Sequence, residues 1–198
     1  GLASGVGGSF WFANWSNGVN NNAATVQAGS HNFASTSQSG ARPLVPAGSA
    51  SNDSFVGQLG SKNAAIVGQS NGANAQATLQ AGYKNGATTA QTNAPASASQ
   101  NASATVQLGA RNNALTSQIA NPLAGGANGS LIMQLGTDNQ AVVGQANGTG
   151  LQPMIGANLQ QTVQVGSGNY AATSQASSGG VTNTSVTAQF GYKNVAVV

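Results

Sequence analysis

Residues 101–118 read NASATVQLGARNNALTSQ, and they contain the pattern that decides the fold: Asn, five residues, Gln-x-Gly-x-x-Asn-x-Ala, three residues, Gln. The same eighteen-residue frame occurs seven times, at 21–38, 52–69, 74–91, 101–118, 128–145, 158–175 and 183–198. The seventh copy stops at Val198, two residues before the position of the closing Gln. Self-similarity of this kind is typical of a solenoid, in which a repeat buries its face only against its neighbours. We therefore predict a stack of seven repeats.

Each frame is expected to form a strand, a tight turn and a second strand. The central Gly-x-x-Asn predicts the turn, because Gly adopts positive φ without penalty and Asn tolerates the left-handed region. The flanking segments, such as SLIMQ at 130–134, carry β-branched and apolar residues that favour strands. Proline cannot donate to a strand ladder, and all five prolines lie between frames, at 43, 46, 95, 122 and 153. The fold predicted is all-β: a cross-β solenoid of seven strand-turn-strand rungs with two facing parallel sheets, polymerising end to end.

The two-residue period of a strand places the recurrent Asn and Gln on one face of each strand, together with small residues such as Thr105 and Ala114. We predict that this face is a narrow interior in which stacked amides bond to the copies above and below, as in cross-β ladders. With the turn Gly, the predicted ladder residues are Asn21, Gln27, Gly29, Asn32, Gln38, Asn52, Gln58, Gly60, Asn63, Gln69, Asn74, Gln80, Gly82, Asn85, Gln91, Asn101, Gln107, Gly109, Asn112, Gln118, Asn128, Gln134, Gly136, Asn139, Gln145, Asn158, Gln164, Gly166, Asn169, Gln175, Asn183, Gln189, Gly191 and Asn194.

The opposite face of each strand is more variable and often apolar, for example at Phe55, Leu79 and Phe190. Two interpretations stay open: mixed solvent exposure, or a face for lateral packing between filaments. Linkers of four residues (70–73) to thirteen residues (39–51) are expected to project from one edge, with the tight turns along the other.

Composition favours association. Five Lys and Arg and two Asp residues are the only charged residues among 198, so charge repulsion between copies is weak. The solenoid is expected to be uncapped at both ends, and an exposed sheet edge without charge or proline invites pairing with another molecule. The chain has no Cys, which excludes disulfides and thiolate metal sites, and no apolar run long enough to span a membrane.

No catalytic constellation is present, and we expect neither enzymatic activity nor a cofactor. The two acids, Asp53 and Asp138, lie in different frames, and Glu is absent. The single His31 falls in a turn with no acid in its repeat to orient it as a base. Serines are numerous, but a nucleophile needs a positioned base.

The repeated Gln-x-Gly-x-x-Asn-x-Ala-x-x-x-Gln resembles the curlin repeat of the curli major subunit family, the secreted functional amyloids of bacterial biofilm matrix. The match covers residues 21–198; Asn stands where that family usually has Ser, six residues before the first Gln, and the linkers are longer. The resemblance implies an extracellular, cell-surface fibre that grows by nucleated polymerisation and serves in adhesion and biofilm matrix. It also implies a secretion pore and a nucleating minor subunit as partners. A start at Gly1 suits a processed, exported chain and equally a trimmed one.

Residues 1–20 form a Gly-rich and aromatic leader, with four aromatic rings in the segment 10–15, FWFANW. The family resemblance implies a leader that lies outside the amyloid core and addresses the secretion pore. Docking of the rings on a preceding subunit or a neighbouring filament is a second hypothesis, and a flexible segment is the third.

Cations recur just before the Asn of the turn, at Lys62, Lys84, Arg111 and Lys193. One interpretation is solubility and protection of exposed turns. The other is a cationic stripe that holds extracellular DNA or acidic polysaccharide, with binding that weakens steeply in salt.

The leading functional prediction is a structural fibre subunit. The alternative is a binding module, a monomeric β-solenoid whose face recognises ice or carbohydrate. The sequence does not separate a major subunit from a minor or nucleating one.

Overall fold

The computed structural model describes residues 2–6, 10–17, 20–40, 51–93, 99–120, 126–147, 156–177 and 180–198, the first two ranges by their backbone only. All five prolines and most linker residues lie outside these ranges. The prediction that the longer linkers project from one edge also concerns residues outside these ranges. The described residues form sixteen β-strands, and no helix among them is long and apolar enough to cross a membrane.

The strands form two sheets of eight. The odd-numbered sheet contains β1 (Leu2–Val6), β3 (Asn21–Ser30), β5 (Asn52–Ser61), β7 (Ala73–Tyr83), β9 (Gln100–Ala110), β11 (Gly126–Thr137), β13 (Gly156–Ser167) and β15 (Thr182–Tyr192). The even-numbered sheet contains β2 (Phe10–Asn17), β4 (Asn32–Ser39), β6 (Ala64–Ser70), β8 (Gly86–Asn93), β10 (Asn113–Ala120), β12 (Gln140–Asn147), β14 (Tyr170–Ser177) and β16 (Val195–Val197).

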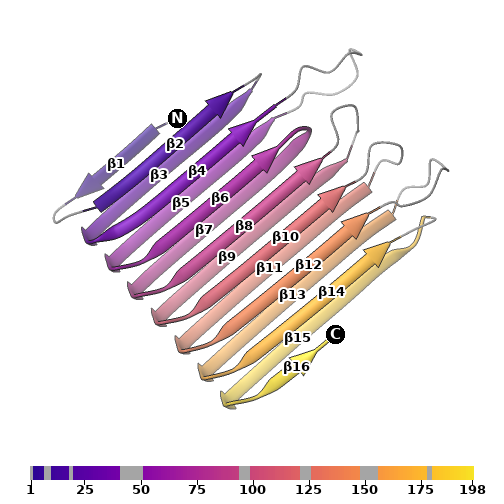
Figure 1. Cartoon of the computed structure of the whole chain (residues 1–198). Coiled ribbons are helices and arrows are strands. Elements are labelled where there is room, and N and C mark those ends of the chain that lie inside the picture. The colour runs from indigo at the N-terminus through magenta and orange to yellow at the C-terminus, as the bar shows by residue number, and fades with distance from the viewer. Residues whose placement is uncertain are drawn as a thin grey trace.

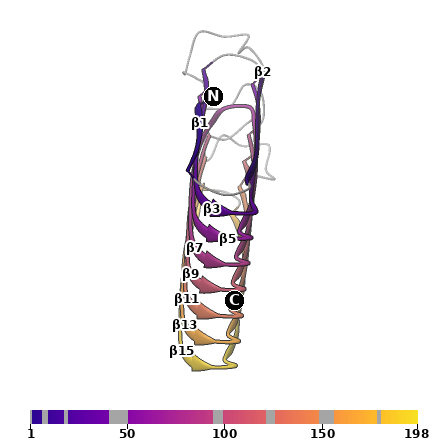
Figure 2. The ribbon, with the colours of Figure 1, turned by 90° about the vertical axis from the view of Figure 1, so that its left-hand side faces the viewer.

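Each frame forms one rung, which we define as an odd-numbered strand, its tight turn and the following even-numbered strand. Successive rungs stack as parallel neighbours in both sheets, so the chain advances steadily from the first rung to the last (Figure 1). Seen from the side, the two sheets face each other as two thin layers (Figure 2). Identical frame positions pair throughout: Gln107, for instance, is in register with Gln80 and Gln134. The predicted all-β solenoid with two facing parallel sheets is confirmed.

The leader differs from the expectation that it lies outside the stack. Its strand β1 pairs with β3, and β2 pairs with β4 along the whole of β2, both in parallel. The leader therefore adds a partial rung before the first frame, and the solenoid is not bare at this end. The physical reason is general: the edge of the first rung presents unpaired backbone groups, and any extended segment can satisfy them.

The interior is narrow and contains small side chains. Strand burial alternates strictly, so that Val56, Ala65 and Val67 in rung two are at most 2% exposed and form one cluster with Ala34. Rung five has the equivalent cluster around Ile132. In the other complete rungs Thr occupies both of the frame positions held by Val56 and Val67. Rungs with two threonines at these positions and rungs with two aliphatic residues therefore have the same backbone arrangement.

The presence of Val in some rungs where others have Thr predicts that Thr116→Val stabilises the protein. The Thr116 side chain is fully buried, and its Oγ1 has no hydrogen-bond partner among the described residues. Valine has nearly the same shape, and Val143 already fills the equivalent position one rung away. Removing a buried unsatisfied hydroxyl is expected to raise the free energy of unfolding by about 1 kcal/mol. Denaturant unfolding measures it, with the outward-facing Thr88→Val as the matched control; a lower midpoint for Thr116→Val would contradict the argument.

Candidate functional site

Two Gln ladders run through the interior in one direction. In the first, the side-chain Nε2 of each Gln donates to Oε1 of the next: Gln80 to Gln107, Gln107 to Gln134 and Gln134 to Gln164, all at 2.8 Å. The second ladder repeats this from Gln91 to Gln118 and from Gln118 to Gln145, also at 2.8 Å. The second proton of each amide goes to a backbone carbonyl, as from Gln107 to Gly86 at 2.8 Å. Buried amides are costly when unpaired, and this arrangement pairs both protons.

Two Asn ladders run in the opposite direction. Asn112 Nδ2 donates to Oδ1 of Asn85 in the preceding rung at 3.2 Å, and Asn139 donates to Asn112 at 3.1 Å. The Asn that opens each frame behaves in the same way, since Asn128 donates to Asn101 at 2.9 Å. The stack therefore has a direction: Gln amides point along the chain from rung to rung, and Asn amides point back.

The turns show why Gly and Asn recur there, and one prediction about them is wrong. The left-handed residue is not the Asn but the one before it, with φ between 53° and 58° at His31, Lys62, Lys84, Arg111, Asp138 and Lys193. The Asn itself must point inward, because its backbone N–H and its side chain both bond to the Asn of the preceding rung. The Gly has φ between 106° and 124° in all seven rungs.

The turn Gly also lies against the next rung. A Cβ added to Gly109 would overlap the backbone carbonyl oxygen of Gly136, and the same holds for the turn glycines of rungs one to six. That carbonyl accepts a hydrogen bond from the Asn112 side chain at 3.0 Å. The absence of a Cβ at Gly109 therefore lets rungs four and five approach closely enough for Asn112 to reach this carbonyl.

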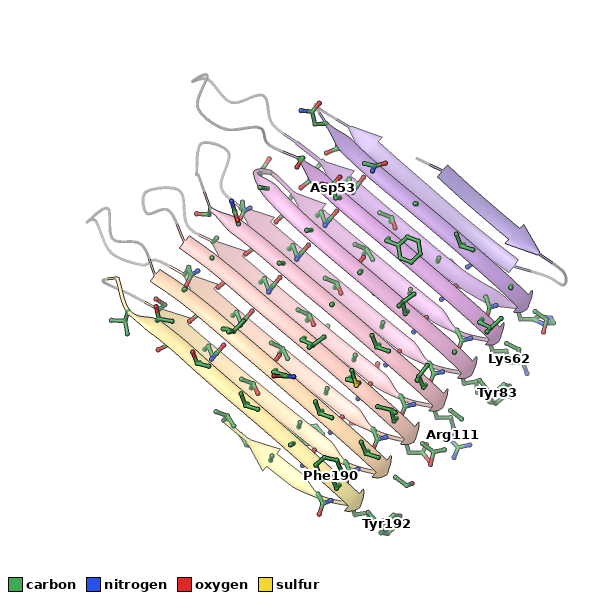
Figure 3. All side chains as sticks on the ribbon, turned by 180° about the vertical axis from the view of Figure 1, so that it is seen from behind. Asp53, Lys62, Tyr83, Arg111, Phe190 and Tyr192 are labelled. Atoms are coloured by element: carbon green, nitrogen blue, oxygen red, sulfur yellow. The ribbon has the colours of Figure 1, made fainter. Side chains whose placement is uncertain are left out.

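The four predicted stripe cations all lie on the turn edge, where Lys62, Tyr83, Arg111 and Tyr192 are seen along one side of the molecule (Figure 3). Arg111 is not free, because its guanidinium makes two 2.7 Å bonds to the Asp138 carboxylate in the next rung. This contact lowers the pKa of Asp138 and raises the pKa of Arg111. The stripe is thus interrupted by a neutral pair.

The remaining cations group around tyrosines. Lys62 Nζ lies 3.4 Å from the Tyr83 hydroxyl, and the Lys62 and Lys84 amines lie 5.5 and 5.2 Å from the centre of its ring. The hydrogen bond from Lys62 is the main cause that lowers the pKa of Tyr83. Lys193 lies 4.8 Å from the ring of Tyr192 in the last rung.

The titratable residues considered for catalysis do not converge. His31 lies exposed in the first turn, Asp53 faces outward near the start of β5, and Asp138 is held by Arg111. Within the described ranges, no group of three or more His, Asp or Glu residues is close enough to hold a metal ion.

Comparisons with protein-family models, with curated proteins and with solved structures find no match.

Proposed function

We propose that this chain is a structural subunit that polymerises end to end into an extracellular, curli-like fibre. The observation that carries the proposal is the direction of the four ladders. Each of the first six rungs presents its Gln donors and Asn acceptors on one side and its Gln acceptors and Asn donors on the other, and rung seven does so with Gln189, Asn183 and Asn194. A stack with two complementary sides can be extended by another stack of the same chain, head to tail.

The edge formed by β15 and β16 supports this. Gln189 accepts from Gln164 at 2.8 Å, and by the rule of the ladder its amide points toward the next rung. Asn183 and Asn194 donate to the sixth rung at 2.9 Å and present their Oδ1 atoms on the other side. The first rung of a second subunit carries the matching Gln27, Asn21 and Asn32 at the same frame positions.

The leader strands β1 and β2 pair with β3 and β4, and this is the sheet edge at which another subunit would join. At the frame positions where the repeats carry Gln, Asn and Gln, the register places Gly5, Phe10 and Ser16 of the leader. None of these residues has the amide that the ladders need. We therefore propose that an incoming subunit replaces the leader strands, so that rung seven of one copy pairs directly with rung one of the next.

The alternative, a monomeric module that binds ice or carbohydrate, would need a regular ladder of polar side chains on an outer face. The recurrent threonines are at most 2% exposed at Thr25, Thr78 and Thr105, so they do not supply it. Binding of DNA or acidic polysaccharide at Lys62, Lys84 and Lys193 stays a prediction, as do secretion through a pore and a nucleating partner.

Purified chain is expected to form fibres with a meridional spacing near ~4.8 Å and an equatorial spacing near ~10 Å, because rungs stack along the axis and sheets face each other across it. Each subunit should advance the fibre by about 34 Å, which is seven rungs at ~4.8 Å. Electron microscopy and fibre diffraction measure both.

A chain lacking residues 1–19 should elongate seeds faster than the full chain, because no leader strand has to leave the edge of rung one. If both the full chain and the chain lacking residues 1–19 stay monomeric at high concentration, the proposal is contradicted.

A further inference from the structure

The two outer faces of the solenoid differ in chemistry. We call the outer surface of β3–β15 the odd-strand face and that of β4–β16 the even-strand face. At the second, fourth, sixth and eighth frame positions, which face outward on the odd-numbered strands, every residue is apolar or Gly except Asn22, Asp53, Gln161 and Thr184. Two further exposed polar residues on this face, Gln100 and Thr182, come just before their frames. Rungs three, four and five carry no polar side chain at these four positions. On the even-strand face each of the first six rungs carries at least one outward polar residue, among them Ser35, Ser70, Thr88, Ser117, Gln140 and Ser174.

Large apolar side chains on the odd-strand face are open to solvent. Leu59 is 62% exposed, Leu79 46% and Leu108 42%, although all three belong to strands that are paired on both sides. Contiguous apolar surface of this extent is uncommon on soluble monomers and marks an interaction site.

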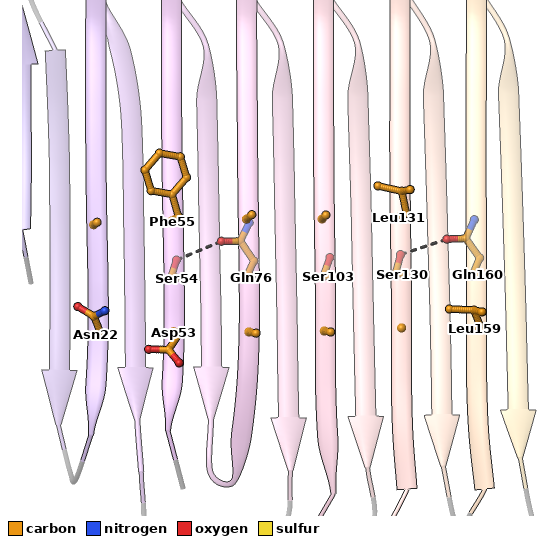
Figure 4. A pocket seen from close by; sticks show the side chains of 16 residues that line it. Asn22, Asp53, Ser54, Phe55, Gln76, Ser103, Ser130, Leu131, Leu159 and Gln160 are labelled. Atoms are coloured by element: carbon orange, nitrogen blue, oxygen red, sulfur yellow. Dashed lines mark hydrogen bonds between the residues drawn. The ribbon is translucent and has the colours of Figure 1, made fainter. Parts of the chain in front are cut away.

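The face is shaped as ridges and hollows. A shallow hollow of about 520 Å³ lies over small residues of β7 and β9, with Phe55 on one side and Leu131 and Leu159 on the other (Figure 4). A second hollow of about 420 Å³ surrounds Gly57 and is bordered by Val26 and Leu79. Bulky residues therefore stand beside hollows that lie over Ala and Gly.

We infer that the odd-strand face pairs with the odd-strand face of a second copy of this chain, so that the fibre contains two solenoids back to back. The inference rests on the proposed function for its fibre form. A second copy is the partner whose strands recur at the same rung spacing, so the outward positions of the two copies can stay in step along the whole face. Phe55 stands beside a hollow that contains the small residues Ala77 and Ala104, and Asp53 is the only charged residue at the outward frame positions of this face.

The available area is sufficient. Seven rungs at ~4.8 Å and four outward positions at ~6.6 Å intervals give a face of about 34 by 20 Å, or about 680 Å² per copy. A pair would bury roughly 1,400 Å², within the range of specific protein interfaces, and each further subunit in the fibre adds the same amount. The even-strand face also exposes Ile66 and Ile119, but the polar residue that each of its first six rungs carries suits contact with water.

The test compares two pairs of substitutions at the same two rungs. Leu79→Lys with Leu108→Lys places charge on the odd-strand face, and Thr88→Lys with Leu115→Lys places it on the even-strand face. Scanning transmission microscopy measures mass per length, with circular dichroism to verify folding. We expect the odd-strand variant to halve the mass per length and the even-strand variant to keep the wild-type value. An unchanged value for the odd-strand variant, or a loss confined to the even-strand variant, would overturn the inference.

Measurements on the unpolymerised chain distinguish a failure of this inference from a failure of the proposed function. If the wild-type chain forms no fibres, the polymer proposal fails, and sedimentation then tests the pairing alone: a dimer that becomes a monomer only in the odd-strand variant supports it. A wild-type chain that sediments as a monomer and instead binds phosphatidylcholine vesicles through the odd-strand face would overturn the pairing, because that face would then serve a membrane surface.

Discussion

Gly109→Ala is expected to lower the stability of the stack by roughly 2–6 kcal/mol and to melt rungs four and five together. Two costs add. The backbone at Gly109 has φ +117°, where a residue with a Cβ is strained by about 1–3 kcal/mol. The new methyl would also overlap the Gly136 carbonyl, and separating the rungs to relieve it costs about 1–3 kcal/mol. Hydrogen exchange of β9 and β11, together with the thermal midpoint, measures the effect.

Two matched glycines separate these costs. Gly144 has ordinary φ and open space around an added Cβ, so Gly144→Ala should change stability by no more than about 0.5 kcal/mol. Gly191 has φ +106°, but a Cβ there meets only Asn194 Nδ2 at 3.7 Å, so Gly191→Ala should show the strain without the clash. In the proposed fibre, Gly191 faces the first rung of the next subunit, and Gly191→Ala should therefore stop elongation. Equal losses at Gly109 and Gly144 would contradict this account.

Much of the fold follows from local rules that a single sequence displays. The Gln-x-Gly-x-x-Asn frame has strand periodicity on both sides of a turn, so the inward face could be predicted, and the structure places Gln107, Asn112 and Gln118 in its interior. The exclusion of proline from the frames pointed to the same strands. The exchange of Thr for Val was also visible in the sequence. Where rung four has Thr105 and Thr116, rung two has Val56 and Val67 at the same two frame positions.

Other features could not be predicted because they arise from stacking. The left-handed residue before the turn Asn is Lys or Arg in four rungs, and neither type prefers that conformation, so only the need to turn the Asn inward explains it. The leader contains no frame residues that would pair it with rung one; its strands are held through the backbone. The opposite directions of the Gln and Asn ladders likewise depend on amide geometry that composition does not reveal.

Gln107→Leu combined with Gln118→Leu is expected to destabilise the stack by about 4 kcal/mol and to slow fibre elongation. Leucine fills nearly the same volume but neither donates nor accepts. Gln134 Oε1 and Gln145 Oε1 each lose the 2.8 Å bond from the preceding rung, and they lie where water cannot replace it. An unsatisfied buried polar group costs about 1–3 kcal/mol, and each ladder supplies one or more. Denaturant unfolding of the soluble chain and seeded growth of fibres measure the two effects.

Gln140→Leu is the matched control, since Gln140 is exposed on β12 and belongs to neither ladder. It should leave both measurements within error of the wild type. The double variant also separates two origins of the stacking register. If the ladders align the rungs, the interruption at rung four should broaden the unfolding transition, because rungs one to three and five to seven then lose their coupling through the amides. If the backbone ladder and the Gly contacts alone align them, the transition should keep its width and fibres should grow at the wild-type rate, which would contradict a role for the Gln ladders in assembly.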